Sequence, residues 1–154
     1  MIPHDLDVRL RTFAEGLLAS VAHDLELVAV PRELSGAPGT TTAVFGAGDV
    51  RVIGAVKRGE IDPSVLSDKD KREIEHRVQH DHLRGDVQVE VSGDEVMVTT
   101  TRGRQKVRGT RREGELRCSL SLKALGLGTI KGPLGVFKLK DTVEVRAKLA
   151  PPPP

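Results

Sequence analysis

Apolar and polar residues alternate with a period of two along much of this chain. Residues 86–91 read DVQVEV, and residues 95–101 read EVMVTTT after the turn signal Ser92-Gly93-Asp94. Successive strand residues point to opposite faces of a sheet, so the two segments predict a hairpin with one apolar and one polar face. The same alternation predicts further strands at 25–29, 50–56, 116–123 and 143–149.

One long segment has no such alternation. Residues 67–82 read SDKDKREIEHRVQHDH, which is rich in helix-forming residues and contains neither Gly nor Pro. Ser67 and Asp70 have the spacing of a capping box at its start. The segment predicts a surface helix with a narrow buried stripe, formed by Leu66, Ile74, Val78 and Leu83.

These elements predict an all-β, mainly antiparallel fold of about eight strands with one α-helix inserted mid-chain. Eight such strands that close into a barrel enclose packed side chains or one small ligand. A flat sandwich is the alternative. Residues 1–150 are expected to form a single domain, and residues 151–154, all proline, a disordered tail.

Composition narrows the nature of the interior and of the partners. Aromatic residues make up 2% of the chain, with three Phe and no Tyr or Trp, so the core must be mostly aliphatic. A net charge of +2 gives no overall attraction to nucleic acid. No apolar run is long enough for an integral membrane segment. The first residues lack the pattern of a signal peptide, so a cytoplasmic location is expected.

Candidate catalytic and metal-binding residues are few. His76 and His80 share a face of the predicted helix, with His82 beyond and Asp81 between His80 and His82, but the residues between His76 and His80 lack the glutamate of an HExxH motif. Surface histidines are therefore favoured, and a metal-dependent hydrolase that uses them is kept as an alternative. The single cysteine, Cys118, occupies an apolar position of a strand. The chain is expected to be no enzyme and to need no cofactor.

The stretch RGRQKVRGTRR is the strongest charge feature. Arg102, Arg104, Lys106 and Arg108 are spaced two apart, so they share one face of a strand. A solvated outer face is the simpler interpretation. An interaction module that binds an anionic partner through this face is a second alternative, although no aromatic residue is present there to stack on bases.

Four pieces of the sequence, in order, give the chain a resemblance to a known family. They are Ala22-His23-Asp24-Leu25, Leu66-Ser67-Asp68-Lys69-Asp70, Ser121–Leu127 (SLKALGL) and Leu139–Val145 (LKDTVEV). With these pieces and the strands between them, the chain resembles the YceI-like family of polyisoprenoid- and lipid-binding proteins. The resemblance implies a lipocalin-like antiparallel β-barrel that holds a long apolar ligand and has no catalytic machinery.

The expected function is noncatalytic binding or transport of an isoprenoid or fatty-acyl chain in the barrel lumen. No nucleic-acid partner is expected, and a homodimer is left open. Phe13, Phe45 and Phe137 are candidates to close the ends, and His23 is a candidate contact for a polar head group. For any single residue, ordinary core packing is the simpler explanation. The candidate wall residues are Leu25, Leu27, Val52, Val87, Val89, Val98, Leu120, Leu122, Val143 and Val145.

Overall fold

The computed structural model describes residues 6–15, 24–37, 39–127 and 138–149. Within these ranges it contains twelve strands, one α-helix, one 3-10 turn and one π-helical turn. The strands are β1 (Leu6–Glu15), β2 (Asp24–Ala29), β3 (Glu33–Ala37), β4 (Thr40–Phe45), β5 (Val50–Lys57), β6 (Glu60–Asp62), β7 (Val87–Ser92), β8 (Glu95–Thr99), β9 (Arg104–Arg108), β10 (Thr110–Arg112), β11 (Glu115–Ser121) and β12 (Lys138–Leu149). The helical elements are η1 (Ala47–Asp49), α1 (Asp68–Arg77) and η2 (Val78–Leu83).

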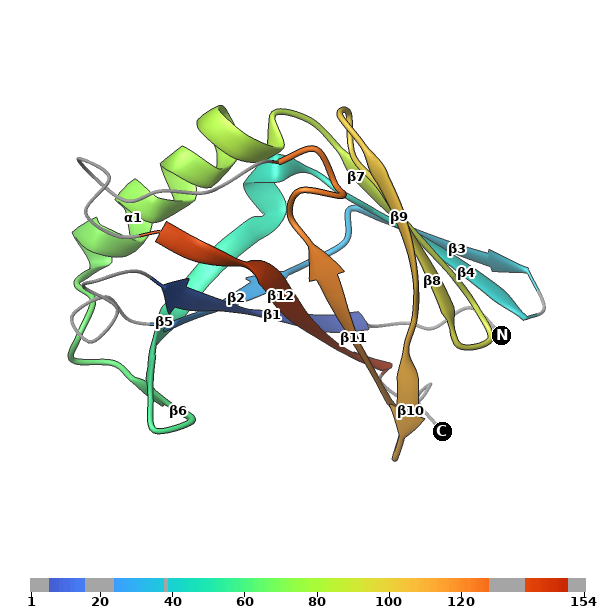
Figure 1. The fold of residues 1–154 in the computed structure, drawn as a ribbon, viewed down its shortest axis with the longest axis horizontal. Helices are drawn as coiled ribbons and strands as arrows, with labels where there is room; N and C mark the ends of the chain where they lie inside the picture. The colour runs from blue at the N-terminus through green and yellow to red at the C-terminus, as the bar shows by residue number, and fades with distance from the viewer. Residues whose placement is uncertain (1–5, 16–23, 38, 128–137, 150–154) are drawn as a thin grey trace.

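The strands form two antiparallel sheets (Figure 1). The first sheet has seven strands in the order β10-β11-β12-β1-β2-β5-β6, and the second has five in the order β3-β4-β7-β8-β9. The predicted hairpin of residues 86–101 is present as β7 and β8, with Val89 opposite Val98. A mainly antiparallel β fold with one α-helix is thus confirmed. The proline tail, residues 151–154, lies outside the described residues.

The expected single barrel does not appear in the strand pairing. Among the described residues, no strand pair joins the first sheet to the second. The segment from β9 to β10 shows why: β9 pairs with β8 of the second sheet, and after Gly109 β10 pairs with β11 of the first. A Cβ at Gly109 would lie 2.6 Å from the side chain of Leu116, so glycine permits the close approach at this change of sheet.

A β-bulge in β5 reverses part of the predicted alternation. Leu27 pairs with Val52 and Glu26 pairs with Gly54, which leaves Ile53 as the extra residue. Beyond the bulge Ala55 pairs with the inward Leu25, so it takes the inner face. The prediction that residues 50, 52, 54 and 56 share one face is therefore wrong after Val52.

Polar side chains form the N-terminal cap of helix α1 and attach the helix to β5. Asp70 N donates to Ser67 Oγ at 3.1 Å and Ser67 N donates to Asp70 Oδ2 at 3.0 Å, which confirms the capping box. These bonds to Ser67 hold the pKa of the Asp70 carboxyl below its usual value. Glu75 Oε2 accepts a hydrogen bond from Val52 N at 2.9 Å, and this contact fixes α1 against β5.

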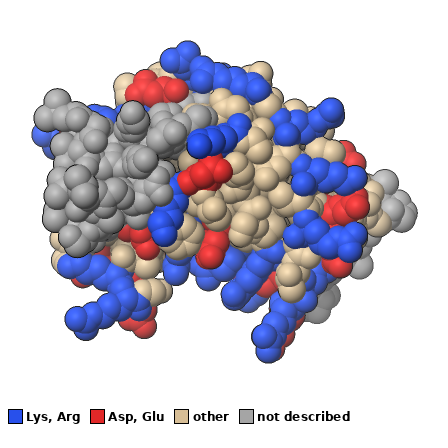
Figure 2. Space-filling view, viewed as in Figure 1, with Lys and Arg blue, Asp and Glu red and all other residues tan. Residues whose placement is uncertain are grey.

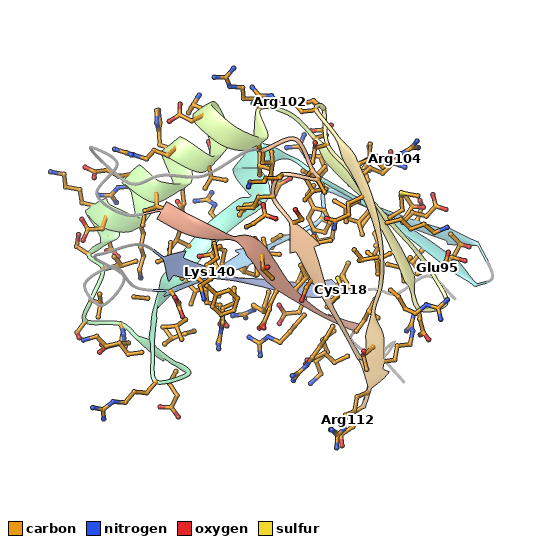
Figure 3. All side chains as sticks on the ribbon, in the orientation of Figure 1. Glu95, Arg102, Arg104, Arg112, Cys118 and Lys140 are labelled. Atoms are coloured by element: carbon orange, nitrogen blue, oxygen red, sulfur yellow. The ribbon has the colours of Figure 1, made fainter. Side chains whose placement is uncertain are left out.

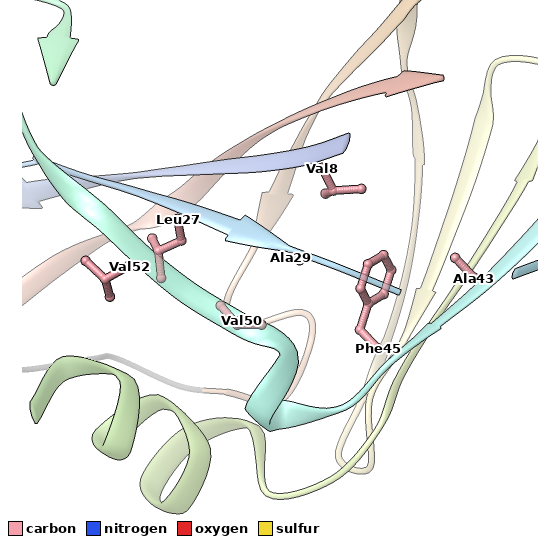
Figure 4. Close-up of a cluster of buried hydrophobic side chains, with 7 residues drawn as sticks. All are labelled: Val8, Leu27, Ala29, Ala43, Phe45, Val50 and Val52. Atoms are coloured by element: carbon pink, nitrogen blue, oxygen red, sulfur yellow. The ribbon is translucent and has the colours of Figure 1, made fainter. Parts of the chain in front are cut away.

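The buried core is aliphatic, as the composition predicts, with Phe45 as its aromatic member. One cluster joins the inner faces of both sheets (Figure 4) and consists of Val8, Leu27, Ala29, Ala43, Phe45, Val50 and Val52. A second cluster contains Val96, Val98, Leu116 and Leu125.

Hydrogen bonds tie the two sheets together on the side of β9 and β11. The Thr100 hydroxyl donates to Leu125 O at 2.6 Å and accepts from Gly103 N at 3.1 Å. Gln105 Oε1 of β9 accepts from Ser121 N of β11 at 2.8 Å. Side chains, instead of a backbone ladder, therefore connect the sheets here.

None of the helices in the described ranges has the length and apolar character needed to cross a membrane.

Candidate functional site

A cavity of about 560 Å³ lies between the inner faces of the two sheets. Ligand pockets in proteins commonly enclose about 300–1,000 Å³, so the cavity is large enough for an organic ligand. Its lining comes from both sheets and from α1 and η2, and most of its lining side chains are aliphatic.

The wall from the second sheet follows directly from strand alternation. Val87, Val89 and Val91 of β7 face the cavity, whereas Gln88 and Glu90 between them are exposed on the outer face. On the adjacent strand β8, Val96 and Val98 line the cavity. On β4, Thr41, Ala43 and Phe45 extend this wall.

The wall from the first sheet is built in the same way. Leu10 of β1 pairs with Leu27 of β2 and with Val145 of β12, so the three side chains lie side by side on one face. All three line the cavity. The other members of this wall are Leu6, Val8, Thr12, Leu25, Ala29, Val50, Leu116, Cys118, Leu120, Val143 and Ala147.

Charged lining groups come from only two elements of the described structure. Asp70, Glu73 and Arg77 belong to α1, and Arg111 belongs to β10. These two elements lie on opposite sides of the molecule in Figure 1. Among the described lining residues, ionic contacts with a ligand are therefore available only near α1 and β10, and the polar groups elsewhere are the hydroxyls of Thr12, Thr41 and Thr100 and the thiol of Cys118.

Ten of the candidate ligand-contacting residues line the cavity: Leu25, Leu27, Phe45, Val87, Val89, Val98, Leu120, Leu122, Val143 and Val145. Val52 is buried but does not line it. Phe13 is half-buried and is also not a lining residue, since Thr12 beside it on β1 takes the inner face. His23 and Phe137 lie outside the described residues.

Several lining residues were not singled out from the sequence. Leu6, Val8 and Leu10 of β1 alternate with charged residues in the stretch LDVRLR, so the period-two signal was present there. Ala43 of β4 carries a weaker signal, because its strand begins with three threonines. The predicted apolar stripe faces inward, since Leu66, Ile74, Val78 and Leu83 all line the cavity and pack on the core, but these side chains are half-buried and not buried as expected.

Cys118 lines the cavity from β11 (Figure 3) and is half-buried. Burial raises the pKa of its thiol to about 11. The side chain is therefore a neutral thiol near pH 7 and lacks the thiolate character that nucleophilic catalysis requires.

The helix histidines do not form a metal site in the described structure. The rings of His76 and His80 stack with centroids 4.1 Å apart and planes tilted by 36°. The side chain of His82 lies outside the described atoms. The described residues hold no group of three or more His, Cys, Asp or Glu side chains that could bind a metal ion. The geometry thus gives no support to a metal-dependent hydrolase.

The face of the first sheet that points away from the cavity carries a buried charge. Glu26 is only 4% exposed, and its Oε1 accepts hydrogen bonds from Arg11 at 2.8 Å and from Arg146 at 2.6 Å. The two arginines balance the carboxylate, so this cluster holds β1, β2 and β12 together.

Two of the sequence pieces behind the family resemblance meet in space. The Ser121 hydroxyl donates to Asp141 Oδ2, and Lys123 N donates to Asp141 Oδ1 at 2.9 Å. These hydrogen bonds, with that from Ser121 the stronger cause, hold the pKa of the Asp141 carboxyl below its usual value. The two pieces therefore fix the turn after β11 and do not contribute a polar group to the cavity middle.

No protein-family model matches this chain, and a search of curated proteins finds no significant match. The likeness to the YceI-like family thus rests on the four sequence pieces.

Proposed function

We propose that the protein binds, without chemical conversion, a long apolar chain such as an isoprenoid or fatty-acyl group in the cavity between its sheets. The observation that carries the proposal is the lining: aliphatic side chains from both sheets surround about 560 Å³, and in the described part of the chain charged groups enter only from α1 and β10. Such a surface offers a ligand hydrophobic contact along its length and ionic contact at its extremities.

The energetics suit a hydrocarbon ligand. Burial of each CH₂ group contributes about 0.8 kcal/mol, so a chain of several methylenes binds without a specific polar contact. Aromatic ligands gain less here from ring stacking, because Phe45 is the one aromatic side chain among the lining residues of the described structure.

In this proposal the two sheets are the walls of a lipocalin-like container. The segment from β9 to β10 forms one corner, where the chain passes from one sheet to the other at Gly109. The helix α1 contributes Ile74 to the lining and so covers part of the interior. The sheets enclose the ligand in this arrangement although their backbone ladders are not joined.

A cavity-filling variant tests the proposal. Val89→Trp places a large ring into the cavity, and Gln88→Trp places the same ring on the exposed outer face of the same strand. The chain has no Trp of its own, so each variant also gains one fluorescent reporter. Affinity for saturated fatty acids is measured by displacement of an apolar fluorescent probe.

We expect the wild type to bind more tightly as the chain lengthens, by about 1.6 kcal/mol or about 15-fold for every two CH₂ groups, until the cavity is filled. Val89→Trp should weaken binding at least tenfold, and Gln88→Trp should leave it unchanged. Equal affinities of the two variants, or no dependence on chain length, would contradict the proposal.

A further inference from the structure

The basic stretch of the sequence forms one continuous exposed face. Arg104, Lys106 and Arg108 are exposed on β9, the edge strand of the second sheet. Figure 3 shows Arg102 above β9, Arg104 beside it and Arg112 at the lower tip of β10. Lys and Arg side chains are frequent on the right-hand side of the space-filling view, with Asp and Glu side chains between them (Figure 2). We call residues 102–112 the basic face.

Charge is concentrated strongly on this face. Residues 102–112 contain six Lys and Arg residues and no Asp or Glu. Because the whole chain carries +2 and this segment carries +6, the rest of the chain carries −4. Four of the acids outside the segment, Asp94, Glu95, Glu113 and Glu115, lie on or next to the strands that adjoin it, so the excess positive charge of this face is that of the arginines without an ion pair.

Acidic residues lie opposite part of this face, since Arg108 is the register partner of Glu95 and Arg112 that of Glu115, but only two of the six cations form ion pairs in the described structure. Lys106 lies 3.2 Å from a Glu95 carboxylate oxygen, and Arg111 lies 3.4 Å from one of Asp94. The other four have no ion-pair partner within the described part of the chain: Arg102, Arg104, Arg108 and Arg112. Their guanidinium groups are free to contact an external anionic surface.

The basic face also borders the cavity. Arg111 of β10 is a lining residue, and so is Gly114 in the turn between β10 and β11. A surface that contacts this face would thus lie beside one extremity of the apolar interior.

We propose that the basic face docks on an anionic lipid bilayer. Clustered Lys and Arg side chains are attracted to the negative surface of membranes that contain acidic phospholipids. A bilayer fits this surface better than nucleic acid for two reasons. The described Phe residues lie on β1 and β4, and the chain has no Tyr or Trp, so nothing on this face stacks on bases. The cavity beside the face suits a hydrocarbon source.

The strength of docking depends on charge, whereas the choice of a bilayer over nucleic acid rests in part on the proposed cavity function. Each free arginine should contribute about fivefold to the partition onto an acidic membrane. Reversal of two of them should therefore reduce binding by at least about 25-fold. The attraction should weaken steeply as salt shortens the screening length.

Sedimentation with vesicles tests the proposal. The full chain is mixed with vesicles of phosphatidylcholine, with and without phosphatidylglycerol, in about 0.05 to 0.5 M NaCl. The test variant is Arg104→Glu/Arg108→Glu. Its matched control is Lys57→Glu/Arg72→Glu, which changes the net charge equally at exposed residues of β5 and α1. Arg104→Gln/Arg108→Gln replaces the test variant if charge reversal prevents folding.

Binding that requires phosphatidylglycerol, falls with salt, and is lost in the test variant but kept in the control supports the proposal. Equal loss in the control would overturn it, because net charge alone would then explain binding. Salt-sensitive binding to an RNA or DNA oligonucleotide, without vesicle binding, would also overturn it. The Val89→Trp variant should keep its vesicle binding, so failure of the cavity proposal and failure of docking give different results.

Discussion

Glu26 and Leu27 are neighbours on β2 and show how one step along a strand changes a residue's surroundings. Leu27 faces the cavity, whereas Glu26 is buried against Arg11 and Arg146 on the opposite face. On β2 an aliphatic side chain therefore lies on the inner face, and an ion-paired carboxylate lies on the outer face. Residue identity follows the face, and the cavity stays apolar because the carboxylate at position 26 points away from it.

Cys118 is the natural reporter of the cavity at this scale. Its thiol has a pKa of about 11 against an ordinary value of 9.0, because burial disfavours the thiolate. The thiolate is the form that attacks thiol reagents, so at pH 8 the folded protein should be labelled about a hundredfold more slowly than the urea-unfolded chain. The labelling rate is followed by mass spectrometry as a function of pH.

The sign of the linked stability is also fixed. The folded state holds the Cys118 proton more tightly than the unfolded chain does. The contribution of this group to the free energy of unfolding is therefore fully present below about pH 9 and is lost as the pH rises towards 11. A Cys118→Ala variant should lack this alkaline loss. Equal labelling rates for the folded and unfolded protein would show that the thiol is not buried as described.

At the scale of elements, alternation proved sufficient for some strands and not for others. The strands β7 and β8 were predicted because their valines alternate with polar residues and a Gly-containing turn joins them. The short strand β6 follows the turn Arg58-Gly59, and the short strand β10 is followed by the turn Glu113-Gly114. Both residues of each turn have positive φ. Arg and Glu rarely adopt this conformation, so such turns carry little sequence signal.

The bulge in β5 marks a different limit. The residues before and after Ile53 read as one alternating strand, yet the partner strand β2 has one residue fewer in the register. A bulge depends on the pairing of two strands and on the docking of α1, which uses the Val52 amide through Glu75. No pattern within residues 50–56 contains that information.

The contact between the β8–β9 turn and the turn after β11 should contribute measurably to stability. Thr100→Val keeps the shape of the side chain but removes the hydroxyl that bonds Leu125 O and Gly103 N. The buried groups left without partners should lower the free energy of unfolding by about 1–3 kcal/mol. Urea unfolding measures the change.

Thr99→Val on the adjacent position of β8 is the matched control for this experiment. Its side chain faces away from the cavity, so its effect should stay within about 0.5 kcal/mol. Indistinguishable midpoints for Thr99→Val and Thr100→Val would contradict the role assigned to the Thr100 hydroxyl.

For the whole molecule, the sequence predicted which side chains line the interior better than it predicted how the strands pair around it. The alternating valines and leucines identified the faces that line the cavity, and ten named residues lie there. Alternation does not say which strands pair, however, and the segment from Arg104 to Arg112 divides its pairing between two sheets at Gly109. In the described structure the strand ladder is not continuous at that point, so a closed barrel is not confirmed.

Native mass spectrometry of the protein freshly purified from cells tests the cavity proposal most directly. We expect the wild type to carry a noncovalent adduct that organic extraction removes and identifies as a long-chain hydrocarbon compound. The Gln88→Trp variant should carry it too, whereas Val89→Trp should not. A wild-type protein that has the mass of the bare chain, and stays bare after incubation with fatty acids and isoprenoids, would contradict the account.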